Sequence, residues 1–135
     1  MITREDFLSI PRIAKELRDE KNRIEVIRGK LYSPRGLDTN EKVQSSGGQT
    51  ALADVVIDLE QKLDLKEMEL GRLQEQAKDA VLGSDTLSGE QVMLMILRYV
   101  DCAGWSEITE TLHYSIATVY RMHRESLEII FGGEA

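Results

Sequence analysis

The sequence has few of the residues that build disulfides or a thick globular core, with one cysteine, two prolines and 5% aromatic residues in 135. The lone Cys102 excludes a disulfide or a multi-cysteine metal site within one chain. No apolar run approaches the roughly 18 residues that a membrane span needs. The N-terminus lacks the basic and then apolar pattern of a signal peptide. Together these absences predict a cytoplasmic protein with no membrane association.

Strand patterns are also absent, because no segment alternates Val, Thr and Tyr with polar residues. Apolar residues instead recur every three or four positions, which is typical of amphipathic helices. We therefore predict an all-α fold, in which two long amphipathic helices form a coiled-coil-like hairpin ahead of a C-terminal three-helix domain. The predicted parts are an N-terminal helix (1–31), a linker (32–49), a second long helix (50–83) and the C-terminal domain (86–131).

Each long helix carries a narrow apolar seam that one polar residue interrupts, Glu20 in the first and Lys66 in the second. The seams comprise Ile10, Ile13, Leu17, Ile24, Ile27 and Leu31, then Leu52, Val56, Leu59, Leu63, Leu70, Leu73, Ala77 and Ala80. A stripe this narrow must be covered by another helix. The pattern leaves open a hairpin within the chain, a homodimer through the long helices and an ordinary monomeric bundle. Pro11 is expected in the first turn, where a missing amide hydrogen is harmless.

The segment between the long helices is rich in glycine and serine. Together with Pro34, these residues argue against continuous helix from Gly29 to Gln49, and they favour a flexible linker. Arg35 and Lys42 are candidates for contact with a DNA backbone. The sequence assigns this segment no mechanism.

The C-terminal 49 residues have the pattern of a helix, a turn, a short helix, a second turn and a third helix. Ser88 and Gln91 form a capping box for the first helix, and Gly104 is expected to end it. Trp105, Ile108 and Leu112 give the short second helix its apolar face. His113 and Tyr114 form the second turn, and Ser115 caps the third helix. This order of elements is typical of a helix-turn-helix DNA reader.

The third helix divides into an inward face and a face suited to a DNA groove. Val119, Met122, Leu127 and Ile130 are expected inward. Thr118 suits a base edge or a thymine methyl group, and Arg121 suits guanine. Arg124 and His123 suit phosphates. The predicted DNA-binding residues are Ser115, Ala117, Thr118, Tyr120, Arg121, His123 and Arg124. The alternative is a plain three-helix bundle whose arginines are merely solvated.

A family resemblance rests on short motifs: "L-R-Y" at 97–99, "E-I" at 107–108 and "S-I-A-T-V" at 115–119. They resemble region 4 of the primary bacterial sigma factors, which reads the promoter −35 element. With "S-P-R-G" at 33–36 and "V-Q-S-S" at 43–46, the whole chain is similar to phage regulators of the ArpU and RinA type. The resemblance implies a regulator of late or packaging genes in a bacterial host, with duplex DNA and host RNA polymerase as partners. Thr109 and His113 depart from the usual alanine and glycine.

The net charge of −7 opposes simple DNA binding, because nucleic-acid binders tend to be basic. From residue 87 onward the chain has three basic residues (Arg98, Arg121 and Arg124) and seven acidic ones. Few phosphate contacts imply weak binding by a monomer, so a second copy or another protein is needed. Two alternatives stay open: a DNA-packaging protein like a terminase small subunit, and a sigma mimic that binds polymerase without DNA.

Catalytic chemistry is not indicated by any motif. The "S-S-G-G-Q-T" segment at 45–50 lacks the lysine of a phosphate-binding loop. The pairs Asp54 with Asp58 and Glu60 with Asp64 are explained by a solvated helix face. We therefore expect neither an enzyme nor a bound metal or cofactor.

Overall fold

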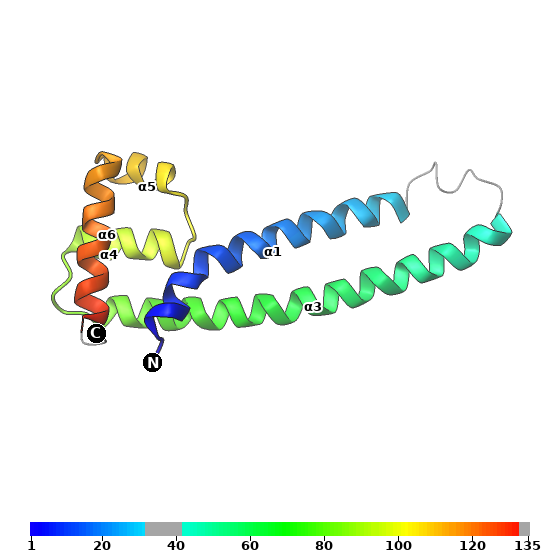
Figure 1. Ribbon diagram of the computed structural model, residues 1–135, viewed down its shortest axis with the longest axis horizontal. Coiled ribbons are helices and arrows are strands. Elements are labelled where there is room, and N and C mark those ends of the chain that lie inside the picture. Colours follow the sequence, from blue (N-terminus) through cyan, green and yellow to red (C-terminus); the bar gives the residue numbers. More distant parts are fainter. Residues whose placement is uncertain (32–41, 133–135) are drawn as a thin grey trace. The chain divides into compact units, whose positions relative to one another are not determined.

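The computed structural model describes residues 1–31 and 42–132, and within them it contains five helices and no strand (Figure 1). The all-α prediction is confirmed. No helix in the described residues is both long enough and apolar enough to cross a membrane. The helices are α1 (Arg4–Leu31), α3 (Lys42–Leu82), α4 (Gly89–Tyr99), α5 (Trp105–Leu112) and α6 (Ile116–Phe131).

The chain divides into two compact units whose boundaries cut across both long helices. Unit 1 combines Met1–Ala14 with Leu70–Ala135, and unit 2 is Lys15–Glu69. The sequence instead suggested a C-terminal domain starting at residue 86. The difference arises because the beginning of α1 and the last turns of α3 contribute buried side chains to the core that also contains α4, α5 and α6.

The beginning of α1 is set by Thr3, whose hydroxyl oxygen accepts a hydrogen bond from the Asp6 amide at 3.1 Å. This side-chain cap satisfies an amide hydrogen that has no partner within the helix. Pro11 consequently lies inside the helix and not in its first turn, which corrects the expectation from the sequence. Burial of Phe7 and Ile10 explains why helix forms ahead of the proline.

In unit 2 the two polar interruptions of the apolar seams meet each other. The Lys66 ammonium nitrogen lies 2.7 Å from a Glu20 carboxylate oxygen. Arg28, later in α1, forms an ion pair with Glu60, earlier in α3, so the two segments run in opposite directions. The predicted seam residues Leu17, Ile24, Val56 and Leu63 are buried, and Ile24 and Leu63 lie between the two pairs. Because the side chains of both pairs remain about a third or more exposed to solvent, we attribute to each only about 0–1 kcal/mol of stability.

The start of α3 differs from the prediction, because helix begins at Lys42 and not at residue 50. Glycine and serine therefore do not prevent helix over residues 42–49. Helix propensity is a weak determinant, and each such residue costs at most about 1 kcal/mol. The rest of the predicted linker, residues 32–41 with Arg35, lies outside the described residues.

Unit 2 also has an apolar stripe on the surface of α3. Ile57, Leu65 and Met68 are 52%, 67% and 71% exposed. Their spacing of eight and three residues places them on one side of the helix, away from the buried Val56 and Leu63. We refer to Ile57, Leu65 and Met68 as the α3 stripe.

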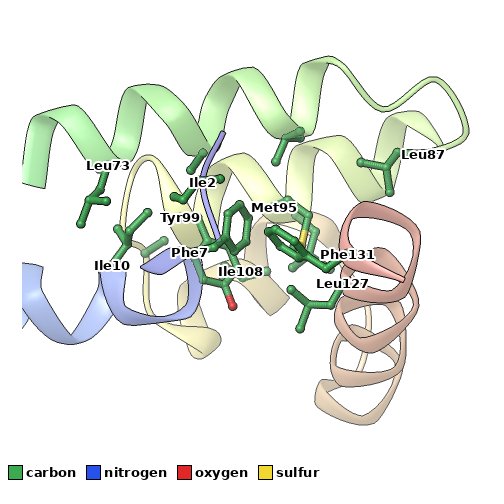
Figure 2. Close-up of a cluster of buried hydrophobic side chains, with 14 of the residues drawn as sticks. Ile2, Phe7, Ile10, Leu73, Leu87, Met95, Tyr99, Ile108, Leu127 and Phe131 are labelled. Carbon is green, nitrogen blue, oxygen red and sulfur yellow. The ribbon is translucent and has the colours of Figure 1, made fainter. Parts of the chain in front are cut away.

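The core of unit 1 is built around Phe7, which is fully buried. Its ring centroid lies 4.2 Å from that of Tyr99 and 5.1 Å from that of Phe131. Figure 2 shows these three side chains together with Met95 from α4 and Leu127 from α6. The N-terminal segment thus packs against both α4 and α6 through the side chain of Phe7.

Candidate nucleic-acid interface

The first helix of the interface, α4, begins at the predicted capping box. The Ser88 hydroxyl accepts from the Gln91 amide at 3.2 Å, and the Gln91 side-chain oxygen accepts from the Ser88 amide at 2.9 Å. Leu94, Met95 and Tyr99 are buried along one side of the helix. The predicted capping box is confirmed.

The first turn does not depend on Gly104 in the way that the sequence suggested. Helix α4 ends at Tyr99, and Gly104 is the residue that precedes the first turn of α5. The chain reverses at Cys102, which has a positive φ of 55°, and the Ala103 amide then donates to the Leu97 carbonyl at 2.8 Å. Gln74 of α3 fixes this turn, because its side-chain nitrogen Nε2 donates to the Val100 carbonyl at 2.8 Å.

The second turn follows the prediction closely. His113 adopts the left-handed conformation, with φ 63° and ψ 37°, where the sigma-like pattern has glycine. Histidine tolerates this conformation better than most residues. The Ser115 hydroxyl caps α6 by accepting from the Thr118 amide at 3.2 Å. The other departure, Thr109, is accommodated because its hydroxyl donates to the Ser106 carbonyl at 2.7 Å.

Helix α6 separates its residues into two faces, as predicted. Val119, Leu127 and Phe131 are buried, together with Ser126, whose hydroxyl donates to the Met122 carbonyl at 2.7 Å. Of the predicted DNA-binding residues, five are exposed and Thr118 is half-buried; the exposed ones are Ser115, Ala117, Tyr120, Arg121 and Arg124. The structure thus brings six of the seven predicted site residues onto the outer face of one helix.

The seventh residue, His123, is a correction. It was expected to point outward with Arg124, but its ring is half-buried and stacks on Tyr99 with a centroid distance of 5.7 Å. Its Nε2 atom lies 2.6 Å from the Tyr99 hydroxyl oxygen. Burial, and to a smaller extent the charges of Arg98 and Arg4, lower the pKa of His123 to about 4. The structure therefore does not place His123 on the exposed face with Arg124, and its contact with phosphates stays a prediction.

Sequence reasoning missed the support behind this face, which comes from Arg98 and Trp105. The guanidinium carbon of Arg98 lies 4.4 Å from the Trp105 ring centroid, and its Nη1 donates to the Ala103 carbonyl at 3.1 Å. Trp105 in turn meets Tyr120 edge-on, at a centroid distance of 5.1 Å. No local pattern indicates these contacts, because the three residues belong to three different helices.

The electrostatics of the face are mixed. The Arg121 Nε atom lies 3.9 Å from a Glu125 carboxylate oxygen one turn along the helix. Tyr114, at the start of the face, donates to Glu90, and this hydrogen bond raises the pKa of its hydroxyl. Arg124 supplies the second basic group. The face therefore offers two guanidinium groups in an otherwise acidic part of the chain.

No family model, curated protein or solved structure matches this chain. The similarity to sigma region 4 and to ArpU and RinA regulators therefore stays a prediction. Within residues 1–31 and 42–132 there is also no group of three or more His, Cys, Asp or Glu side chains placed to hold a metal ion. The functional proposal therefore rests on the arrangement of α5, the left-handed turn at His113 and α6.

Proposed function

We propose that the protein is a sequence-specific DNA-binding transcription regulator. In this proposal α5 and α6 form a helix-turn-helix pair, α6 lies in the major groove, and the long antiparallel helices form a coiled-coil hairpin. The observation that carries the proposal is the solvent-exposed outer face of the N-terminal half of α6, which follows the left-handed turn at His113. In helix-turn-helix readers this is the part of the second helix that contacts base edges.

The two arginines of α6 would act differently. Arg121 lies one turn from Ala117, whose short side chain allows close approach to the groove, and guanidinium groups bind guanine O6 and N7 in pairs. Arg124 is nearly one further turn along, where phosphate contact is expected. By resemblance, the genes regulated would be late or packaging genes of a phage or prophage.

Replacing Arg121 with alanine is expected to weaken binding to the preferred duplex roughly 5- to 150-fold and to relax selection at one base pair, because a paired contact to guanine is lost. Arg124→Ala should weaken binding to all sequences alike and lower the slope of log affinity against log salt by about one. Affinities of the full chain are measured by fluorescence anisotropy at several salt concentrations, after selection of a preferred duplex from a random library.

Lys78→Ala is the matched control, since Lys78 is an exposed residue of α3 and its loss changes the net charge equally. The control should bind as the unaltered protein does. If Arg121→Ala binds the preferred duplex with full affinity and selectivity, α6 is not the reading helix.

Self-association is the second part of the proposal, because two guanidinium groups per chain provide few phosphate contacts. The α3 stripe is the surface we assign to a second copy of the chain. Leu65→Glu is expected to convert a dimer into a monomer at the same concentration, because the carboxylate would be buried on association. Mass is measured by size-exclusion chromatography with light scattering.

Leu82→Glu is the control for this experiment, since Leu82 is an exposed leucine of the same helix and belongs to unit 1. The stripe is not a dimer surface if both variants and the unaltered chain have one mass at every concentration. A ring of many copies would instead favour the packaging alternative, in which the chain resembles a terminase small subunit.

The second candidate function is a sigma mimic that binds host RNA polymerase without DNA. The excess of acidic residues from residue 87 onward favours it. Failure to retain any duplex at low salt, together with capture of purified polymerase by the full chain, would support this candidate over the DNA reader.

A further inference from the structure

The outer face of α6 carries apolar groups as well as arginines. Ile116 is 43% exposed and Tyr120 is 46% exposed, and they lie one turn apart with the exposed Ala117 beside them. We call Ile116, Ala117 and Tyr120 the apolar patch. The same helix contributes Val119, and not Ile116 or Tyr120, to the buried core, so the patch is not part of that core.

The Tyr120 ring is held in place from behind. Trp105 of α5 meets it edge-on at a centroid distance of 5.1 Å. Trp105 is itself fixed by the Arg98 guanidinium at 4.4 Å and by the His123 ring at 5.0 Å. An aromatic ring that is already ordered loses little conformational freedom on binding, so its contacts contribute more to affinity.

The hydroxyl groups of Ser115 and Thr118, which lie near the patch, hydrogen-bond to each other at the start of the helix. Ser115 Oγ accepts from the Thr118 amide and lies 3.0 Å from Thr118 Oγ1, to which it donates. The start of α6 therefore offers apolar contact more readily than it offers hydrogen bonds. Among the major-groove edges of the four bases, only thymine presents an apolar group, its C5 methyl.

From this geometry we infer that the patch selects thymine through its methyl group, so that A·T pairs lie opposite Ile116 and Tyr120. This inference rests on the proposed DNA-reading function and adds the base that the face prefers. Arg121 and Arg124, which follow along the same helix, provide the charge complementarity to duplex DNA. Burying one methyl group corresponds to about a fourfold gain in affinity.

The test uses the full chain and the duplex selected from a random library, with single thymines replaced by deoxyuridine. This replacement removes only the methyl group. We expect one or two positions at which uridine lowers affinity about fourfold. Ile116→Ala should abolish the difference in affinity between thymine and uracil at one of these positions. Tyr120→Ala should abolish the difference at the same position or at the other one.

Ile129→Ala is the matched control, because Ile129 is 39% exposed on the C-terminal half of the same helix. It should retain the full preference for thymine. If a preferred duplex exists but every uridine replacement leaves its affinity unchanged, the inference fails and the DNA-reading function stands. If the library yields no preferred duplex, both the thymine preference and the DNA-reading function fail.

Discussion

Replacing Phe7 with alanine is expected to lower the free energy of unfolding by about 3–5 kcal/mol, the range for loss of a buried phenylalanine. Phe7 is fully buried and lies between the rings of Tyr99 and Phe131, so truncation leaves a cavity that both rings face. The measurement is denaturant unfolding, followed by helical circular dichroism and by the fluorescence of Trp105. This residue is the one tryptophan of the chain, and it reports on unit 1.

Leu8→Ala provides the comparison, because Leu8 adjoins Phe7 in the sequence but is 40% exposed. Its effect should stay within about 0.5 kcal/mol, as is usual for surface positions. Equal effects of the two substitutions would mean that the N-terminal segment does not pack into unit 1.

The burial of Phe7 shows which segments of the chain make up the domain that contains α4, α5 and α6. The motifs of residues 86–131 look self-contained in the sequence, yet their core is completed by Ile2, Phe7 and Ile10 from one end of the chain and by Leu73 and Ala77 from α3. A proposed DNA reader that depends on distant segments for its core couples the position of α6 to the integrity of the N-terminus.

Features set by neighbouring residues could be predicted from the sequence. The Ser88 and Gln91 box, the left-handed turn at His113 and the cap at Ser115 all depend on residues within four positions of each other. The apolar seams could be predicted too, because helical spacing determines which residues share a face.

Features that depend on distant segments or on small energy differences could not be predicted. The beginning of α3 at Lys42 was missed because glycine and serine lower helix propensity only weakly. The sequence indicates Gly104 as the end of α4, whereas in the structure Cys102 makes the turn, supported by Gln74 from another helix. The apolar patch was seen only in part, since nothing local marks Ile116 as exposed.

His123 shows most clearly how packing changes the chemistry of a predicted site residue. A histidine beside an arginine on a recognition helix suggests a cation for phosphates. In the structure the ring lies between Tyr99 and Trp105, and burial lowers its pKa from 6.5 to about 4. Burial likewise raises the pKa of Tyr99 to about 12, so both members of this hydrogen-bonded pair are neutral at pH 7.

The lowered pKa of His123 predicts a loss of stability in acid. Between pH 6.5 and pH 4 the unfolded chain binds a proton at this residue and the folded chain does not, so stability falls as the pH falls through this window. The full shift corresponds to about 3 kcal/mol, but the ring is half-buried and solvent screening reduces this to about 1–2 kcal/mol. Above pH 6.5 this loss of stability is absent, and below pH 4 it is complete and increases no further.

His123→Gln isolates this effect, because glutamine does not titrate and still offers an acceptor to Tyr99. The difference in unfolding free energy between the unaltered chain and this variant should shift by about 1–2 kcal/mol between pH 7 and pH 4.5, with His113 and the carboxyl groups common to both proteins. At pH 7 the variant should also leave the salt slope of DNA binding unchanged, unlike Arg124→Ala, because the imidazole carries no charge to lose. A pH-independent difference, or a salt slope lowered by about one, would restore His123 as an outward-facing cation.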